Sequence, residues 1–353
     1  DLGRRQDKIR IEIDKRKEAL RKKVNIKKIQ KLSKIDPWFL NQIKDIIDSE
    51  IIIKKKGLPK TYNEFNYIKS IGFSDKRLSE LTNTSEHIVR KKRTALKILP
   101  VYKKVDTCAS EFKSFTPYMY STYQRNFSLN TECEAEPSSR KKIIILGGGP
   151  NRIGQGIEFD YCCCQASYSL KKAGFETIMV NCNPETVSTD YDTSDRLYFE
   201  PLIEEFVFNI IKKEKTKGNL VGVIAQFGGQ TPIKLAKFLH ENKLPILGTQ
   251  YTSIDLAEDR DRFRNLLNKL KLKQAKSGVA KTFPQALKIA DKIGLPLMVR
   301  PSYVLGGRAM EIVHEKKQLK NFVLEAFKAA EKNPILIDKF IDNAMEVDVD
   351  ALS

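Results

Sequence analysis

The sequence predicts a protein of the α/β class that also contains an all-α segment. Between residues 36 and 99 the apolar residues recur at helical spacing, which indicates a group of packed helices. From Lys141 onward, short apolar runs alternate with helical stretches, which is typical of a parallel sheet. Beyond about residue 256 the order of elements changes, and an α+β module is expected. A chain of 353 residues is long enough for two or three domains.

The composition excludes several classes of protein. Hydrophobic residues make up 41% and charged residues 30% of the chain, which fits a soluble globular protein. No apolar run is long enough for a membrane-spanning helix. Three of the six cysteines are consecutive and none forms a Cys-x-x-Cys pair, so neither zinc nor a disulfide framework is predicted. We therefore expect a reducing compartment, the cytoplasm.

The positive charge is concentrated in the first part of the chain. Of the net charge of +19, residues 1–140 carry +14. A basic segment can bind nucleic acid. Acidic residues such as Asp14 and Glu18 are interleaved, however, and no aromatic residue precedes Trp38. A solvated helical face is the favoured interpretation, and no nucleic-acid partner is expected.

Residues 31–140 are expected to form a helical domain followed by an irregular connector, after a short tail at residues 1–30. Short helices are predicted to start at Thr61, at Ser74 and at Thr84-Ser85, because hydroxyl side chains cap helix N-termini. The stretch 74–88 resembles a helix-turn-helix, although a plain αα-hairpin is much commoner. Residues 100–140 show no strong period.

Four strands are predicted in the α/β part, at residues 143–146, 177–180, 221–224 and 245–247. The first ends in a glycine-rich turn, residues 147–160. Gly149 and Gly154 have the spacing of a phosphate-binding loop, but Gln155-Gly156 replaces its Lys-Ser/Thr. A phosphate loop and a tight turn that needs glycine for packing are equally supported.

Two further loops leave alternatives open. Residues 228–232 follow a strand and either line a ligand crevice or cap a helix, with Thr231 at the N-cap and Pro232 at the first helical position. Acidic residues then cluster at residues 185–195, where a metal site and a loop rich in Asx turns explain them equally well.

The last part combines helices at residues 259–270, 284–293 and 318–332 with apolar strands. Arg300 ends one strand, and the Gly306-Gly307 turn leads into the next. This pattern predicts a β-hairpin; such a hairpin can fold over phosphates, with the arginine as a charge clamp. Glu346 alternates with Asp348 and Asp350, which places all three on one strand face.

Taken together, these stretches resemble the large (synthetase) subunit of carbamoyl phosphate synthetase. The resemblance extends from about Ile35 to Leu352. It runs through long ordered strings at residues 36–40, 101–109, 118–123, 147–160, 181–195 and 300–310. Strings of this length in this order are far more specific than any single motif.

The resemblance implies a domain order. Residues 1–30 would be the tail of a preceding synthetase domain, and residues 31–140 a helical oligomerisation domain plus connector. Residues 141–255 would form a parallel α/β pre-ATP-grasp domain. Residues 256–353 would form an ATP-grasp α+β domain, incomplete because its strand pattern is cut at Ser353.

The resemblance also implies an ATP-dependent ligase. Its two homologous halves make carbamate from bicarbonate and ammonia, and then phosphorylate the carbamate. This chain would span the helical domain and the start of the second half, and would not turn over alone. The expected pathways are pyrimidine and arginine biosynthesis. The expected cofactors are ATP and Mg²⁺ (or Mn²⁺), with metal ligands beyond Ser353.

Site residues carry over position by position. Arg260 and Arg300 match arginines that contact ATP phosphates, and Arg300 is the expected catalytic residue. Gly306 and Gly307 match a phosphate-covering loop. Three further matching positions hold the adenosine: Lys339, Ile341 and Glu346. Arginine suits phosphate, glycines suit a mobile lid, and a carboxylate suits the ribose diol.

The sequence departs from the family at few places. Lys339 stands where some members have histidine, and residues 124–131 look inserted. Expected partners are a glutamine amidotransferase, fused or separate, and further copies of the chain through the helical domain. An ammonia-dependent form and another ATP-grasp carboxylase, such as a biotin carboxylase, are the alternatives. The helical domain argues against the latter.

Overall fold

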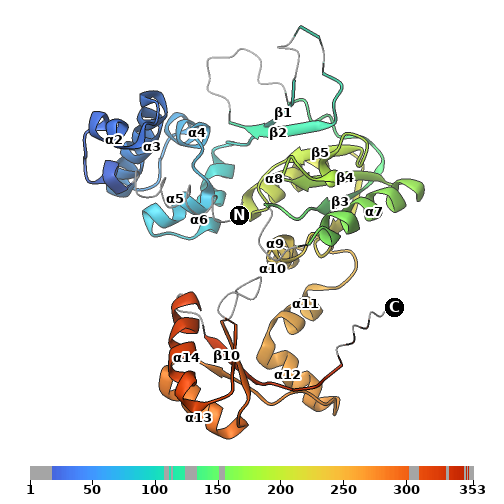
Figure 1. The fold of residues 1–353 in the computed structure, drawn as a ribbon. Helices are drawn as coiled ribbons and strands as arrows, with labels where there is room; N and C mark the ends of the chain where they lie inside the picture. Colours follow the sequence, from blue (N-terminus) through green and yellow to red (C-terminus); the bar gives the residue numbers. More distant parts are fainter. Residues whose placement is uncertain are drawn as a thin grey trace. The chain divides into compact units, whose positions relative to one another are not determined.

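The computed structural model describes residues 18–106, 111–112, 114–123, 133–150, 156–301, 310–330, 334–345, 347 and 349 (Figure 1). The chain divides into two compact units. One comprises residues 1–151 with 157–254, and the other comprises residues 152–156 with 255–353. None of the helices within the described ranges is long and apolar enough to cross a membrane.

The first unit begins with helices, as predicted. They are α2 (Ile26–Ser33), α3 (Pro37–Lys56), α4 (Tyr62–Ser70), α5 (Asp75–Thr82) and α6 (Glu86–Ala95). The predicted caps are confirmed: the side chains of Thr61, Ser74 and Ser85 accept hydrogen bonds from backbone N–H groups in the first turns of α4, α5 and α6. Thr61 also forms a reciprocal capping box with Glu64.

The α/β part of this unit contains a six-stranded sheet. Its strands are β1 (Val101–Lys104), β2 (Tyr118–Thr122), β3 (Lys141–Leu146), β4 (Glu176–Asn181), β5 (Arg196–Phe199) and β6 (Asn219–Ile224), in the order β1-β2-β5-β4-β3-β6. All pairs are parallel except β1 with β2. The strands predicted at 143–146, 177–180 and 221–224 are confirmed, whereas residues 245–247 make only an isolated bridge at Ile246.

The prediction of an irregular connector at residues 100–140 is wrong at two places, because β1 and β2 lie within it. The reason is tertiary: Tyr118 and Met119 pair with Leu197 and Tyr198 of β5, a strand that the sequence reading also missed. These three strands contain no run of aliphatic residues, so their sequences give no strand signal without the pairing partner.

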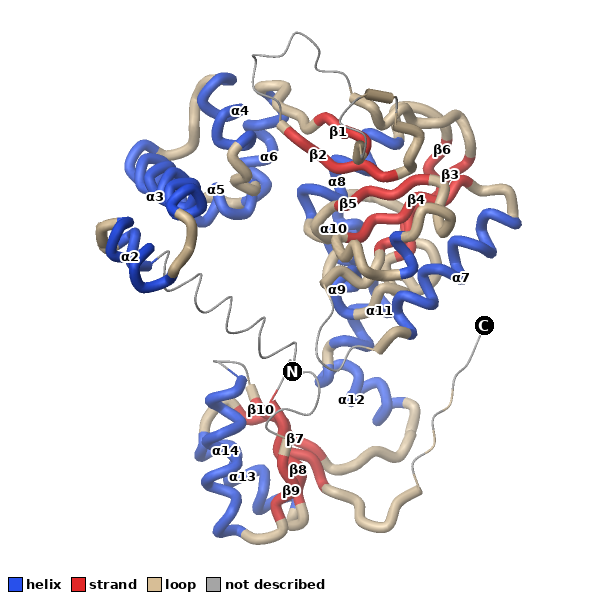
Figure 2. The backbone as a smooth tube through the Cα atoms, turned by 45° about the horizontal axis from the view of Figure 1, so that its top comes forward, coloured by secondary structure: helices blue, strands red, loops and turns tan. Residues whose placement is uncertain are grey.

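Helices cover both faces of this sheet (Figure 2). They are α7 (Glu158–Lys172), α8 (Glu204–Glu214), the short α9 (Gln230–Ile233), α10 (Ala236–Glu241) and α11 (Tyr251–Glu258). Alternate residues of β3 face opposite layers, since Ile145 packs with Cys163 of α7, whereas Ile144 belongs to the cluster that contains Ile210 of α8 and Leu239 of α10. Because β2 to β6 run parallel, the loops that follow these strands lie at one edge of the sheet.

The second unit is the predicted α+β module. Its elements are α12 (Arg260–Lys269), β7 (Ser277–Ala280), α13 (Phe283–Ile293), β8 (Leu297–Pro301), β9 (Glu311–Val313), α14 (Lys316–Ala330) and β10 (Ile335–Lys339). The four strands form an antiparallel sheet in the order β7-β10-β8-β9. The predicted hairpin is confirmed by the pairing of β8 with β9, while β7 was not predicted.

Candidate functional site

The structure describes only part of the predicted nucleotide site. Arg300 lies in β8, Lys339 is the last residue of β10, and Ile341 follows it. Arg260 begins α12, but its side chain lies outside what is described. Gly306, Gly307 and Glu346 also lie outside the described residues, as do Asp348 and Asp350.

One face of the antiparallel sheet forms the core of the second unit. Leu297 and Val299 of β8 are fully buried there, together with Ile335 and Ile337 of β10. The helices α13 and α14 pack on this face, on the same side of the sheet in Figure 2. Because strand residues alternate between faces, their neighbours point to the opposite face.

That opposite face, which we call the open face, carries a mixture of apolar and charged side chains. The strand register places them in two cross-strand rows. One row holds Val279, Leu336 and Arg300, and the other holds Ser277, Asp338, Met298 and Ile312. Directly opposed residues in antiparallel strands share a face. Leu336 is buried within this face, whereas Val279, Met298 and Ile312 are half-buried. The face also carries the Arg300 guanidinium and the Asp338 carboxylate.

Arg300 forms an ion pair across the open face with Asp338, at 2.8 Å from Nε to Oδ2. The Nε atom is buried, but its N–H bond does not point at the carboxylate, so the contact is not a linear hydrogen bond. The Arg300 side chain is 40% exposed, and no hydrogen bond to a described residue engages its terminal nitrogens. Those two nitrogens are suited to bidentate contact with a phosphate.

The Lys339 side chain points to the helix-covered face instead. Its residue stands opposite the buried Leu297, and Nζ donates to the carbonyl oxygens of Gly294, at 3.2 Å, and Leu295. The ammonium group thus satisfies carbonyls just beyond the C-terminus of α13. Ile341 is exposed, and among the described residues its backbone N–H has no hydrogen-bond partner.

A side chain that was not predicted from the sequence, Asn181, binds the glycine-rich turn after β3. Asn181, at the end of β4, is buried, and its Oδ1 accepts hydrogen bonds from the N–H groups of Gly149 (3.0 Å) and Cys182 (2.9 Å). A Cβ atom at Gly147 would lie 2.6 Å from the Asn181 Nδ2. At Gly147 and Gly149 these contacts favour a tight turn packed by glycine, because an amide that an anion would need is already bonded. Gly154 and Gln155, on which the comparison with a phosphate loop also rests, lie outside the described residues.

The helix α9, which starts within the loop at residues 228–232, begins at a different residue from the one predicted. The N-cap of α9 is Gly229 and its first helical residue is Gln230, so the assignment of Thr231 to the N-cap is wrong. Gly229 has φ +76°, which glycine adopts without strain. The buried Thr231 Oγ1 has no hydrogen-bond partner among the residues that the structure describes, and the Thr231 Cγ2 lies beside Gly149. The two loops therefore pack against each other.

The acidic cluster at residues 185–195 serves local structure. The Asp195 carboxylate accepts the Thr177 N–H at 2.8 Å, and the Glu185 N–H donates to Asn183 Oδ1 at 3.0 Å. The described residues contain no group of three potential metal ligands. The contact between Asn183 and Glu185 is an Asx turn, whereas Asp195 binds a backbone amide of β4 that is distant in sequence.

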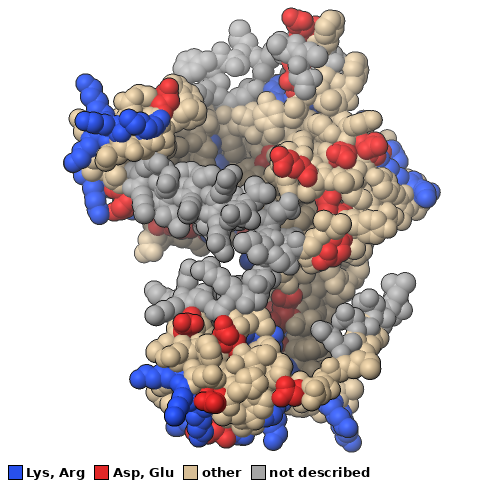
Figure 3. Space-filling view, viewed as in Figure 1, with Lys and Arg blue, Asp and Glu red and all other residues tan. Residues whose placement is uncertain are grey.

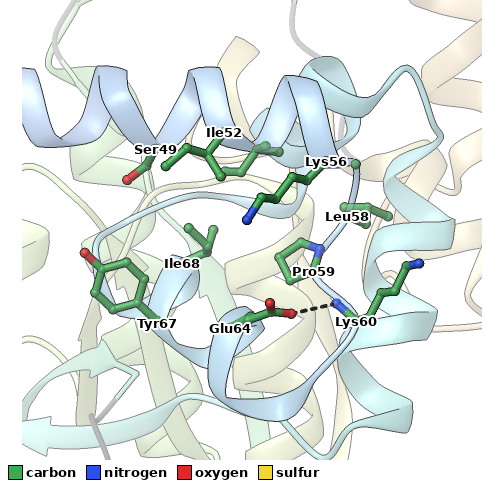
Figure 4. A pocket seen from close by; sticks show the side chains of 11 residues that line it. Ser49, Ile52, Lys56, Leu58, Pro59, Lys60, Glu64, Tyr67 and Ile68 are labelled. Carbon is green, nitrogen blue, oxygen red and sulfur yellow. Dashed lines mark hydrogen bonds between the residues drawn. The ribbon is translucent and has the colours of Figure 1, made fainter.

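A cavity of about 430 Å³ lies in the helical part, between the end of α3 and α4 (Figure 4). It is lined mainly by apolar residues, including Ile52, Leu58 and Ile68, and Glu64 at its rim accepts the Lys60 N–H at 3.3 Å. It contains none of the predicted site residues. On the face shown in Figure 3, basic side chains lie at several separate places with acidic ones between them.

Family models match three consecutive parts of the chain. The carbamoyl-phosphate synthetase large chain oligomerisation domain matches residues 10–97. The carbamoyl phosphate synthase preATP-grasp domain matches residues 139–256, and the carbamoyl-phosphate synthase L chain ATP binding domain matches residues 259–353.

Curated relatives agree with these matches. The chain is 52% identical to the carbamoyl phosphate synthase large chain of Rhizobium meliloti (strain 1021), over 95% of this chain and 31% of that protein. It is 57% identical to the large chain of Pasteurella multocida (strain Pm70), over 91% of this chain and 29% of that protein. The chain thus spans about a third of the length of these relatives.

Among solved structures, the chain is similar to the biotin carboxylase domain of Hydrogenobacter thermophilus 2-oxoglutarate carboxylase. The identity is 21% over 58% of this chain and 45% of that chain, with a TM-score of 0.45. A likeness this weak carries no argument about activity.

Proposed function

Because the chain belongs to the family of carbamoyl phosphate synthase large chains, we propose that it phosphorylates carbamate with ATP, as part of an enzyme that makes carbamoyl phosphate. The observation that carries this proposal is the open face of the antiparallel sheet. It presents apolar side chains beside a guanidinium group whose terminal nitrogens form no hydrogen bond to any of the residues that the structure describes. That combination fits a nucleotide, which needs a flat apolar contact and a cation for its phosphates.

The chain's own residues would bind and orient the nucleotide. The terminal nitrogens of Arg300 would hold phosphate oxygens, while Asp338 restrains the guanidinium from the Nε side. The Ile341 N–H would donate to the adenine edge, which agrees with the Lys339 side chain facing away. Arg260, the Gly306-Gly307 turn and Glu346 are proposed to complete the site, with Glu346 on the ribose hydroxyls.

ATP would supply the phosphoryl group, and magnesium would shield its charge. What the protein contributes to such a transfer is position and charge stabilisation, because the transition state spreads negative charge over the phosphoryl oxygens. Arg300 fits this role as the catalytic residue, since its charge is permanent and its terminal nitrogens are accessible.

We further propose glutamine as the nitrogen source, through an amidotransferase subunit or fused domain, and association of copies through the helical part. Bicarbonate would then be the carbon source, and the product would feed pyrimidine or arginine biosynthesis. The ammonia-dependent form of the same enzyme is the alternative. The turn at residues 147–160 is proposed to line a sheltered path for reactive intermediates.

The test uses the intact synthase. Carbamoyl phosphate formation is followed from bicarbonate and ATP, with glutamine and with ammonium as separate nitrogen sources. We expect Arg300→Ala to reduce product formation about 100-fold or more while bicarbonate-dependent ATP hydrolysis persists. Lys316→Ala is the matched control, because Lys316 is an exposed cation paired with Asp291.

Two outcomes would contradict the proposal. Equal product formation by Arg300→Ala and wild type would remove Arg300 from the site. An absence of product from the wild-type enzyme with either nitrogen source would reject the activity itself.

A further inference from the structure

The helical part and the α/β part of the first unit meet through buried charges. Lys69 of α4 lies between two carboxylates, with Nζ at 3.0 Å from Asp75 Oδ1 and 2.6 Å from Glu205 Oε1. The side chains of all three residues are only 1% exposed. Glu205 belongs to α8, in the α/β part, whereas Lys69 and Asp75 belong to the helices. The Glu205 carboxylate thus joins the two parts, beside the contacts that Arg90 of α6 makes with Glu204 and with the rings of Phe208 and Phe238.

Glu205 is bound on every side. Its Oε2 accepts the backbone N–H of Asp75 at 2.6 Å, and its Oε1 also accepts the hydroxyl of Tyr123 at 3.0 Å. Burial raises the pKa of Tyr123 most, and the nearby Glu205 carboxylate raises it further. The phenol therefore stays protonated and donates its hydrogen bond to Glu205. The Tyr123 ring lies below Lys69 Nζ, 5.1 Å from ring centroid to nitrogen.

Arg93 of α6 balances the second carboxylate. Its Nη2 lies 3.0 Å from Asp75 Oδ2, and its Nη1 donates to the Ile98 carbonyl at 3.0 Å. The group therefore contains two cations, Lys69 and Arg93, and two carboxylates, Asp75 and Glu205. Removing one member of such a buried set leaves an uncompensated charge, which is costly.

Glu205 lies next to the connection between β5 and α8. The N-cap of α8 is Ile203, which provides no side-chain cap, and the Glu205 carboxylate points to the helices α4 and α5 rather than capping its own helix. The preceding Leu202 is buried, and its Cδ1 would lie 3.4 Å from a Cβ atom at Gly149. Leu202 therefore packs on the glycine turn that follows β3.

A continuous line of contacts thus runs from the helices to the glycine turn. We propose that Glu205 is a positioning residue, through which α4 and α5 hold the β5–α8 connection and, by way of Leu202, the turn at Gly149. The structural part of this proposal is independent of any activity. Its functional part, that the position of the turn preserves an intermediate between reaction steps, rests on the proposed synthase activity.

The experiment compares Glu205→Gln with Glu204→Gln in the intact synthase. Both replace a carboxylate by its amide in the same helical turn, but the Glu204 side chain is 42% exposed and its ion pair with Arg90 is long, at 3.7 Å. The first readout is hydrogen exchange of the Gly149 amide, which is bonded to Asn181. We expect exchange at least tenfold faster in Glu205→Gln and unchanged in Glu204→Gln.

The second readout is the amount of carbamoyl phosphate made per ATP hydrolysed, together with KM for ATP. Because the nucleotide is proposed to bind in the second unit, Glu205→Gln should lower the yield per ATP and leave KM unchanged. A merely structural loss would reduce the amount of active enzyme without changing the yield of carbamoyl phosphate per ATP or KM for ATP.

A double variant keeps the test decisive if Glu205→Gln folds poorly. Lys69→Met combined with Glu205→Leu removes both charges together, which buried pairs often tolerate. It should restore folding while the Gly149 amide still exchanges quickly, because the hydrogen bonds to Asp75 and Tyr123 are lost. Wild-type exchange at Gly149 in a folded Glu205 variant would overturn the proposal. Fast exchange with an unchanged yield per ATP would overturn only its functional part.

Discussion

Glu200 is a buried carboxyl group directly after β5. It is 3% exposed and accepts the backbone N–H of Ser121. Burial raises the pKa of Glu200 from 4.5 to about 7, against the opposing effect of the bond from Ser121. The folded state therefore holds a proton that the unfolded state loses near pH 4.5. The contribution of Glu200 to the free energy of unfolding is fully present below pH 4.5 and is lost as the pH rises to about 7.

We expect Glu200→Gln to become progressively more stable than wild type as the pH rises through this window. The gain from pH 4.5 to pH 7 should be about 3 kcal/mol, because the amide has no proton to lose and still accepts from Ser121. Urea denaturation of both proteins at pH 5 and pH 8 measures it. A stability difference that is the same at both pH values would contradict the assignment.

Gly228 is required by close packing rather than by its backbone angles. A Cβ atom at this position would lie 2.3 Å from the carbonyl oxygen of Gly147, a backbone atom that no side-chain rotation can move. We expect Gly228→Ala to cost about 3 kcal/mol of unfolding free energy. The control is Gly174→Ala, where φ is +88° but nothing lies within 4 Å, and about 1 kcal/mol is expected. Equal losses in denaturant titrations would refute the packing argument.

At the residue scale, the sequence identified groups whose role is local and missed those whose role depends on the fold. The caps at Thr61, Ser74 and Ser85 were predictable, because a cap binds residues two or three positions along the chain. Gly149, which donates to Asn181, and Arg300, which pairs with Asp338, are both distant in sequence from these partners, so no spacing reveals the contacts. The one available signal for Asp338 is its place at the end of an apolar strand.

At the scale of elements, helices and strands that contain a run of aliphatic residues were predictable, whereas strands without such a run were not. The helices α12, α13 and α14 start within about two residues of their predicted positions, because each carries several turns of periodic apolar residues. By contrast, β1, β2, β5 and β7 contain four or five residues and depend on pairing with their neighbours. Their strand character is a property of the sheet more than of the segment.

The capping box of α4 offers a test at this scale. The Thr61 hydroxyl accepts the Glu64 N–H at 3.3 Å, and the Glu64 carboxylate accepts the Thr61 N–H at 3.4 Å. We expect Thr61→Ala to destabilise the helical part by about 1 kcal/mol, while Thr61→Ser keeps nearly all of the stability. Hydrogen exchange of the α4 amides measures both. Identical losses in the two variants would mean that the hydroxyl cap contributes nothing.

At the scale of the whole molecule, order along the chain was more informative than any motif. The family resemblance rested on strings distributed from residue 36 to residue 310, and family models match in the same order. The sequence alone could not show which face of the last sheet is open, because β7 had not been recognised. It also could not show that the helices reach the glycine turn through Glu205, since Lys69 and Glu205 are 136 residues apart.

We propose that the residues of the open face around Arg300 bind ATP for the transfer of its phosphoryl group to carbamate. The most direct test is the reverse transfer, the formation of ATP from carbamoyl phosphate and ADP by the intact synthase. We expect wild type and Lys316→Ala to form ATP, and Arg300→Ala to lose about 100-fold or more of this rate while still hydrolysing ATP with bicarbonate. Undiminished ATP formation by Arg300→Ala would show that Arg300 takes no part in the transfer.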